Sequence, residues 1–289
     1  MRYEGNIYRP PSEAYSLIVQ ATIGCSNDTC TFCTMYKDKK FRARPVSDVI
    51  SDLQEARQMY RSVGRIFLAD GDALVLSADK LLSILEEIEK LYPECERVTL
   101  YGTPKDVLSK TPEELRSLRD KGLEMVYLGA ESGDDEVLRR IKKGATADEI
   151  ITAIRRLEEA EIKVSVTFIS GLGGIDLSEQ HAAGIAKVIT EARPSFAALL
   201  TLLLEPGAPM LEDLRAGRFA LMTPEQIAEE TLLLLDLARP ETDCTFRSNH
   251  ASNYVPLKGT LPQDNDRLIA MLKSAIENGA FKHDHFRLL

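Results

Sequence analysis

The sequence has no long hydrophobic run and fewer positive than negative residues. No apolar stretch reaches the roughly 18 residues that cross a bilayer, and the N-terminal segment MRYEGNIYRPPSEAYS lacks the charged and apolar regions of a secretion signal. Lysine and arginine number 36 against 45 aspartates and glutamates, so the formal net charge is -9. The cytoplasm is therefore the predicted location. A membrane is not expected as a partner, and nucleic acid is not favoured because its phosphates would be repelled.

Several common functional motifs are also missing. The sequence contains no internal repeat, no low-complexity linker, no GKS or GKT nucleotide-binding motif and no G-x-S-x-G nucleophile motif. With 289 residues, of which 44% are hydrophobic and 28% charged, the chain has the composition of an enzyme-sized globular protein. Its acidic charge favours a small-molecule substrate.

Short apolar runs alternate with amphipathic segments over the first 200 residues. Six apolar runs predict strands, at 16–23, 65–70, 97–102, 124–130, 163–170 and 196–204. The segments between them have helical periodicity, and several begin with Ser or Thr followed by an acidic residue, as helix N-termini do. This alternation predicts an α/β fold with a parallel sheet, either curled toward a barrel or doubly wound. In both folds, ligands bind at the carboxyl ends of the strands.

Cysteine is scarce, but three of the five cysteines are clustered in the stretch IGCSNDTCTFCTMYKDKKFRARP. Cys25, Cys30 and Cys33 lie in the loop that follows the first predicted strand. A clustered trio in a reducing compartment predicts a metal site or one buried pair, and three thiolates suit an iron–sulfur cluster that keeps one iron open. The alternative is a structural zinc with a distant fourth ligand. Candidates for that ligand are His181, His250, His283, His285, Cys95 and Cys244.

This trio resembles that of the radical S-adenosylmethionine (SAM) superfamily. It ends in Cys-x-aromatic-Cys, with Phe32 as the aromatic residue, and it follows the first strand of a (βα)6 pattern. The resemblance implies a partial (βα)6 TIM-like barrel of parallel strands with a small C-terminal α/β extension. It also implies a 4Fe-4S cluster bound by Cys25, Cys30 and Cys33, with SAM on the fourth iron. The spacing departs from the commonest family pattern, because four residues instead of three separate Cys25 from Cys30.

Two further segments correspond to SAM-binding segments of that family. Asp70, Gly71 and Asp72 follow the second predicted strand, where the family has a Gly-Gly-Glu segment that receives the methionyl ammonium group. Glu131 and Ser132, in GAESG after the fourth strand, resemble the motif of the branch with oxygen-independent coproporphyrinogen dehydrogenases, Elongator-type proteins and methylthiotransferases. The resemblance implies that these residues line the SAM pocket. The alternatives are an ordinary acidic turn and a helix-capping pair.

The fifth predicted strand and the basic run after the cysteines provide further expected contacts. The strand ends in the glycine-rich ISGLGG, so the backbone at Ile169 and Gly171 is expected to approach the adenine of SAM, as in the family. Arg44, in the run KDKKFRARP, is predicted to neutralise the cluster, the SAM carboxylate or an acidic substrate. A solvated basic loop is the alternative for this run.

The alternation stops after Pro206. The rest of the chain predicts a helix in TPEQIAEETLLLLDLA, then a strand, a polar loop and a closing helix. The polar segment RSNHASNY is expected to bind a polar substrate, unless it is a turn held by its own Asn and Ser side chains. The predicted substrate-binding residues are Arg247, Ser248, Asn249, His250 and Asn253. We therefore expect an N-terminal extension at 1–14, a cofactor-binding core at 15–206 and a substrate-side extension at 207–289.

The function implied by the resemblance is that of a radical SAM enzyme. Such an enzyme cleaves SAM reductively and uses the resulting 5′-deoxyadenosyl radical to abstract hydrogen from its substrate. The expected substrate is small and polar, either a modified nucleobase or nucleoside, as for a queuosine-salvage-type lyase, or a tetrapyrrole. An electron donor such as flavodoxin or ferredoxin is an expected partner. The competing hypothesis is a non-catalytic zinc or iron–sulfur module that recruits another protein.

Overall fold

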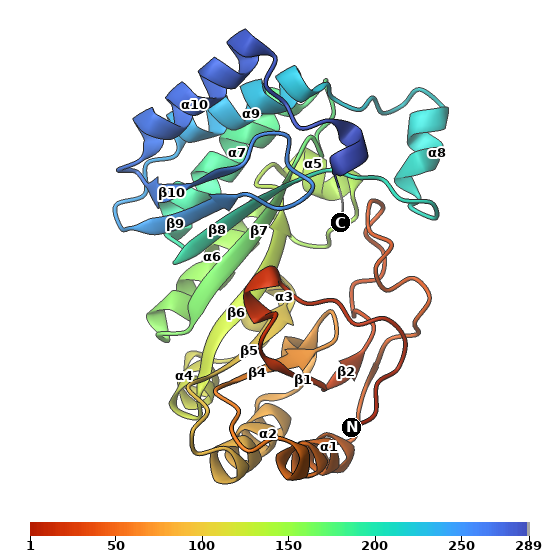
Figure 1. The fold of residues 1–289 in the computed structure, drawn as a ribbon, viewed down its shortest axis with the longest axis vertical. Helices are drawn as coiled ribbons and strands as arrows, with labels where there is room; N and C mark the ends of the chain where they lie inside the picture. The colour runs from red at the N-terminus through yellow and green to blue at the C-terminus, as the bar shows by residue number, and fades with distance from the viewer. Residues whose placement is uncertain (288–289) are drawn as a thin grey trace. The chain divides into compact units, whose positions relative to one another are not determined.

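The short apolar runs of the sequence form the strands of the fold. The computed structural model describes residues 1–287, and Figure 1 shows its helices and strands. Six strands correspond to the predicted ones: β1 (Leu17–Gln20), β4 (Arg65–Ala69), β5 (Arg97–Gly102), β6 (Leu123–Glu131), β7 (Lys163–Ser170) and β8 (Phe196–Thr201). The first prediction was too long, since a separate short strand, β2 (Thr22–Ile23), pairs antiparallel with β3 (Arg42–Ala43). The β2–β3 pair brackets the cysteine loop.

The amphipathic segments form the helices that follow these strands. They are α1 (Val46–Met59), α2 (Ala78–Leu91), α3 (Pro104–Leu108), α4 (Pro112–Asp120), α5 (Asp135–Arg140), α6 (Ala147–Glu159), α7 (Ser178–Ala192), α8 (Met210–Arg215) and α9 (Pro224–Leu237). Capping boxes begin α4 at Thr111 and α9 at Thr223, each with proline at the first helical position. The predicted strand–helix alternation is confirmed.

The chain forms two compact units. The first contains residues 1–28, 35–129 and 156–164, and in it β1, β4, β5 and β6 pair in that order, all parallel. The second contains residues 29–34 and 130–155 and the chain from Ser165 onward. In it β7, β8 and β9 (Cys244–Ser248) are parallel neighbours, and β10 (Leu257–Leu261) pairs antiparallel with β9. The parallel strands confirm the predicted α/β class.

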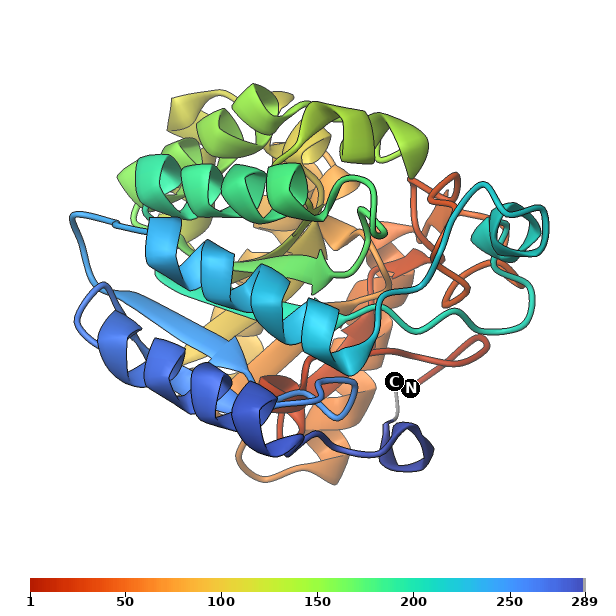
Figure 2. The same ribbon diagram turned by 90° about the horizontal axis from the view of Figure 1, so that it is seen from above.

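The C-terminal region contains one strand that sequence reasoning missed. The predicted helix, strand, polar loop and closing helix are present as α9, β9, the loop after Ser248 and α10 (Asn265–Asn278). Figure 2 shows α7, α9 and α10 side by side in the second unit. The missed strand is β10, whose sequence LKGTL has a central glycine and only two apolar residues, so pairing with β9 decides its conformation. Within residues 1–287, no helix has the length and apolar character needed to cross a bilayer.

Candidate functional site

The cysteine loop runs between β2 and β3, after the carboxyl end of β1, where the sequence predicts the site. Cys30 is buried, whereas Cys25 and Cys33 are partly exposed, as is Phe32. Cys25 belongs to the first compact unit, and Cys30 and Cys33 belong to the second. Among the described residues, no group of three or more His, Cys, Asp or Glu side chains is arranged to hold a metal ion. The binding of one cluster by all three cysteines therefore stays a prediction.

The first half of the cysteine loop is attached to the carboxyl end of β4. The Asp70 carboxylate, which is fully buried, accepts hydrogen bonds at Oδ2 from Gln20 Nε2 (3.2 Å), from the backbone N–H of Gly24 (3.2 Å) and from Lys39 Nζ (2.6 Å). Burial raises the pKa of the Asp70 carboxyl, and the hydrogen bond from Lys39 opposes that effect. In residues 1–287, Oδ1 of Asp70 has no hydrogen-bond partner. This buried oxygen fits a positively charged donor such as the ammonium group of SAM.

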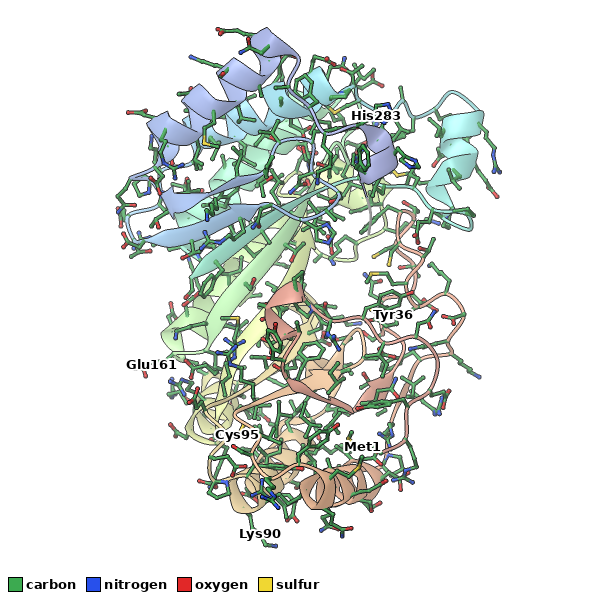
Figure 3. The ribbon with its side chains drawn as sticks, in the orientation of Figure 1. Met1, Tyr36, Lys90, Cys95, Glu161 and His283 are labelled. Carbon is green, nitrogen blue, oxygen red and sulfur yellow. The ribbon has the colours of Figure 1, made fainter. Side chains whose placement is uncertain are left out.

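Gly71 and Asp72 extend the same attachment. The Gly71 N–H donates to Gly24 O (3.1 Å), and Ser26 Oγ hydrogen-bonds to Asp72 Oδ2. A Cβ atom on Gly71 would lie 2.4 Å from the ring of Tyr36, which is labelled in Figure 3, so this position requires glycine. The three residues predicted to receive SAM therefore also hold the cysteine loop in place.

The segment with Cys30 and Cys33 has its own anchors in the second unit. The Thr31 N–H donates to Ile141 O (3.0 Å), and Thr31 O accepts from the N–H of Met210 at the start of α8 (2.9 Å). Thr29 Oγ1 donates to Lys142 O at 3.2 Å. The turn after α5 and the start of α8 thus fix the backbone on either side of Cys30.

Glu131 ends β6 in a conformation that is uncommon for a residue with a side chain. Its φ of 67° lies in the left-handed region, where non-glycine residues occur mainly in turns and at strained functional positions. Its carboxylate pairs with Lys143 Nζ at 3.0 Å, and the two side chains are only 13% and 6% exposed. Sequence reasoning missed Lys143, because RRIKKG at the end of α5 gives no indication of which basic residue turns inward.

Ser132 is linked to the end of β7 through a buried histidine. Its hydroxyl lies 2.8 Å from His181 Nδ1, and His181 Nε2 lies 2.9 Å from Ile169 O. A carbonyl can only accept, so Nε2 donates to Ile169 O. Both ring nitrogens are therefore engaged, which argues against His181 as the distant zinc ligand. Gly133, next in the motif, is required because a Cβ there would lie 2.1 Å from Gly184 O of α7.

Gly171, at the end of β7, is held by a carboxylate from α9. Glu230 is buried and accepts from Ser170 Oγ (2.6 Å), the Gly171 N–H (2.8 Å) and Ser178 Oγ (2.9 Å). Gly171 has a φ of 81°, a conformation that favours glycine. Sequence reasoning missed Glu230, although a signal existed, since it lies at the helical spacing of the apolar stripe formed by Ile227 and Leu234.

Arg44 lies in the first unit and already has a partner. Its guanidinium binds Asp52 Oδ2 of α1 at 2.7 Å and donates to Gln20 O at 2.6 Å. Both charged side chains are less than a tenth exposed. The structure thus gives Arg44 a role in fixing α1 beside β1, and the predicted contact with a cofactor or substrate stays a prediction.

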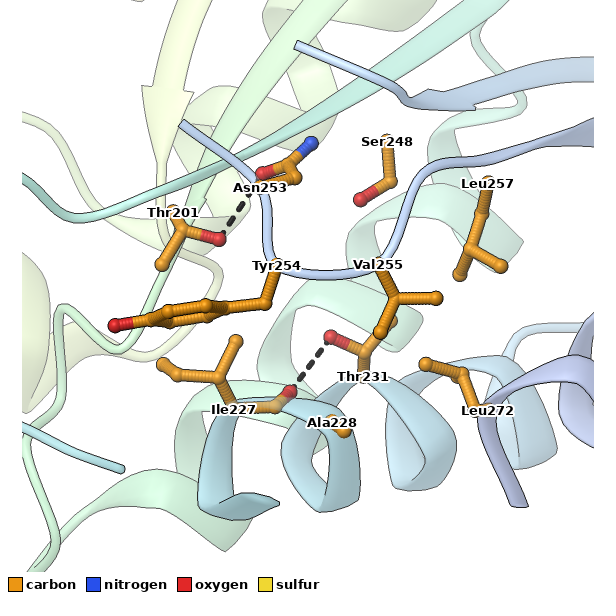
Figure 4. Close-up of a pocket in the computed structure, with 10 residues that line it drawn as sticks. All are labelled: Thr201, Ile227, Ala228, Thr231, Ser248, Asn253, Tyr254, Val255, Leu257 and Leu272. Atoms are coloured by element: carbon orange, nitrogen blue, oxygen red, sulfur yellow. Dashed lines mark hydrogen bonds between the residues drawn. The ribbon is translucent and has the colours of Figure 1, made fainter. Parts of the chain in front are cut away.

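The polar segment 247–254 is folded onto the carboxyl end of β8. The Asn253 side chain is buried, donates to Leu199 O (2.8 Å) and lies 3.0 Å from Thr201 Oγ1 through its Oδ1. Figure 4 shows Asn253 and Ser248 lining a small pocket bordered by Ile227 and Ala228 of α9. The amide of Asn253 is therefore already occupied within the fold.

Three other members of this segment are less enclosed. Arg247 and Asn249 are exposed, and His250 is half-buried. The Ser252 N–H and Ser252 Oγ both lie against His250 Nδ1, at 3.2 and 2.9 Å. Burial, assisted by the charge of Lys282, lowers the pKa of His250. Substrate contact by this segment stays a prediction, and the three residues with accessible groups are its best candidates.

Comparison with known proteins gives matches over most of the parallel core. The family model of the radical SAM superfamily matches residues 19–184. A tRNA-2-methylthio-N(6)-dimethylallyladenosine synthase from Hahella chejuensis is 30% identical over 182 residues, which are 57% of this chain and 38% of that protein. The heme chaperone HemW from Bacillus subtilis is 20% identical over 210 residues, 69% of this chain and 54% of that protein. The chain thus spans about a third to a half of the length of these relatives.

One solved structure shares the fold of this chain. The coproporphyrinogen III oxidase HemN from Escherichia coli, a radical SAM enzyme, aligns with a TM-score of 0.57 at 17% identity. The alignment covers 77% of this chain and 52% of that one. At this identity the likeness concerns the fold, and it confirms the partial (βα)6 TIM-like class with a small C-terminal α/β extension.

Proposed function

The chain belongs to the radical SAM superfamily, enzymes whose cofactors are a 4Fe-4S cluster and SAM, and from this premise we propose that it abstracts hydrogen from a small polar substrate. The observation that carries the proposal is the cysteine loop, which leaves the carboxyl end of a parallel strand and is fastened to the next strand by Asp70, Gly71 and Asp72. Catalytic groups of α/β folds gather at this edge.

The chemistry of the donor groups suits both cofactors. Cys25, Cys30 and Cys33 would hold the cluster, and three thiolates leave one iron for SAM. When bound, the two cofactors supply one-electron cleavage of SAM and hydrogen-atom abstraction. The protein's part is to bind, to orient and to exclude water. In the first unit, the buried Asp70 Oδ1 is an acceptor for a cationic group.

In the second unit, the largely buried Glu131 and the buried Lys143 provide one charge of each sign, and SAM carries both an ammonium and a carboxylate group. The backbone from Ile169 to Gly171, held by His181 and Glu230, supports the proposed adenine contact. Glu131 ends β6, and the segment from Ile169 to Gly171 lies at the end of β7, so both lie where this fold class binds its ligands.

The substrate proposal rests on accessible polar groups at the end of β9 and in the loop after it, and on the relatives. Arg247, Asn249 and His250 offer a guanidinium, an amide and an imidazole to a polar ligand. The Hahella relative's name concerns a modified adenosine in tRNA, and the HemN structure concerns a porphyrinogen. A modified nucleobase or nucleoside and a tetrapyrrole are therefore the two classes to assay, with flavodoxin or ferredoxin as the electron donor. The clustered thiols favour a reducing compartment, hence the cytoplasm.

The test is anaerobic reconstitution of the wild type and of Cys25→Ala, Cys30→Ala and Cys33→Ala. About four irons and four sulfides per chain are expected for the wild type, with loss of the cluster in each variant. Cys95→Ala is the matched control and should keep its iron. With dithionite and SAM, the wild type should slowly release 5′-deoxyadenosine even without substrate. Tight zinc binding with no iron uptake would instead support a non-catalytic module, as would an intact, reducible cluster that releases none.

A further inference from the structure

The cysteine loop begins and ends at one carboxylate. The same oxygen, Asp70 Oδ2, accepts from the N–H of Gly24, immediately before Cys25, and from Nζ of Lys39, beyond Cys33. All three contact groups belong to the first compact unit. Asp70 therefore closes the base of the loop that carries the three thiols.

The contact with Lys39 is a buried ion pair. The Lys39 side chain is 4% exposed and that of Asp70 is fully buried. Lys39 Nζ also donates to Asn6 O and lies 5.4 Å from the centre of the Tyr36 ring. Removal of either member of a buried ion pair leaves the other charge buried without a partner, which is strongly destabilising. Lys39 is thus fixed at the loop's end, in contrast to its exposed neighbours Lys37 and Lys40.

We propose that the Lys39–Asp70 pair is a positioning clamp that restricts the cysteine loop so that its thiols are ordered for the iron–sulfur cluster. The role assigned to Asp70 differs from simple SAM binding, because three donors already converge on its Oδ2. A loop tethered at both ends has fewer conformations, so less entropy is lost when its thiols are gathered onto one cluster. This inference rests on the proposed function, since it presumes that the loop binds a cluster.

The test compares Lys39→Met and Asp70→Asn with Lys39→Arg and with the control Lys40→Met. Lys39→Met removes the positive charge but keeps most of the side-chain length. Asp70→Asn keeps the shape of the side chain without its negative charge. Lys39→Arg keeps a positive charge at position 39. The first readout is hydrogen exchange of the 24–39 backbone in the metal-free protein, alongside its thermal unfolding. The second is the rate at which the reconstituted protein loses iron to a chelator.

The clamp predicts exchange and iron loss at least about tenfold faster in Lys39→Met and Asp70→Asn, because each leaves a buried group without its partner. Lys39→Arg should lie near the wild type, and Lys40→Met should be indistinguishable from it. Unchanged exchange and iron loss in both altered variants would overturn the clamp. Equal acceleration of exchange across the whole chain would also overturn it, as that indicates a general loss of stability.

The two proposals fail in different ways. If the wild type takes up no iron, the proposed function is wrong, and the exchange measurement on the metal-free protein still decides whether Lys39 and Asp70 restrain the loop. If Lys39→Met does not fold, Asp70→Asn and Lys39→Arg carry the same comparison.

Discussion

The buried carboxylate of Glu230 provides a test of how helix α9 supports the end of β7. Glu230 accepts three hydrogen bonds, all from neutral donors, one of which is the N–H of Gly171. Replacement by Gln keeps the size of the side chain and one carbonyl acceptor but removes the negative charge. The adjacent Glu229 is exposed on the same helix, so Glu229→Gln is a matched control.

The expected magnitude follows from these contacts. A hydrogen bond to a charged group contributes about 1.5 to 3 kcal/mol and a neutral one about 0.5 to 1.5 kcal/mol. In Glu230→Gln, Oε1 can still accept from Ser170 and Gly171, but the charge assistance is lost and the new amide faces Ser178. The lower desolvation cost of the neutral amide offsets part of this loss. We expect Glu230→Gln to lower the free energy of unfolding by about 1 to 2 kcal/mol, and Glu230→Ala, which also leaves a cavity, by about 3 to 5 kcal/mol.

Two assays check this expectation. Urea denaturation of the metal-free variants measures the free energy of unfolding, and Glu229→Gln should stay within about 0.5 kcal/mol of the wild type. SAM binding to the reconstituted protein should weaken roughly tenfold in Glu230→Gln, because the Gly171 backbone is held less firmly. A tenfold change corresponds to a loss of about 1.4 kcal/mol of binding free energy. The iron content should not change. A Glu230→Gln variant as stable as Glu229→Gln would refute the reasoning, since the negative charge would then add nothing to the three hydrogen bonds.

Two further predictions concern residues of the second compact unit. Lys143→Met should destabilise the protein by about 3 to 5 kcal/mol because it leaves the largely buried carboxylate of Glu131 without its cation. The double variant Lys143→Met/Glu131→Leu should recover much of that loss in a double-mutant cycle, and additive losses would contradict the pairing. His250 has a lowered pKa, so its contribution to stability is complete above about pH 6.5 and declines as the pH falls toward the folded-state value, because the unfolded chain binds the proton first. Unfolding measured across this range should show a smaller pH dependence in His250→Gln, and an equal dependence would exclude His250 as its source.

Local sequence patterns were sufficient for the elements of the parallel core. A buried parallel strand must be apolar along its length, and a covering helix must be apolar along one stripe, so both leave a periodic signal. The six strand predictions were confirmed on this basis, and the Thr223–Pro224 start of α9 was predicted from its capping chemistry. The strand β10 was missed because its conformation depends on pairing with β9, which no local pattern reports.

The sequence also determined the position of the cysteine trio and its family, since three thiols after a first strand form a local motif. Only the tertiary structure decided which polar groups support that motif. Lys39 meets Asp70, His181 meets Ser132 and Ile169, and Glu230 meets Gly171, each across a long stretch of chain. A buried polar group must find a hydrogen-bonding partner, but its own neighbours in the sequence do not specify which distant group that is. That choice is made when the strands and helices pack, because packing fixes which side chains share the space where water is excluded.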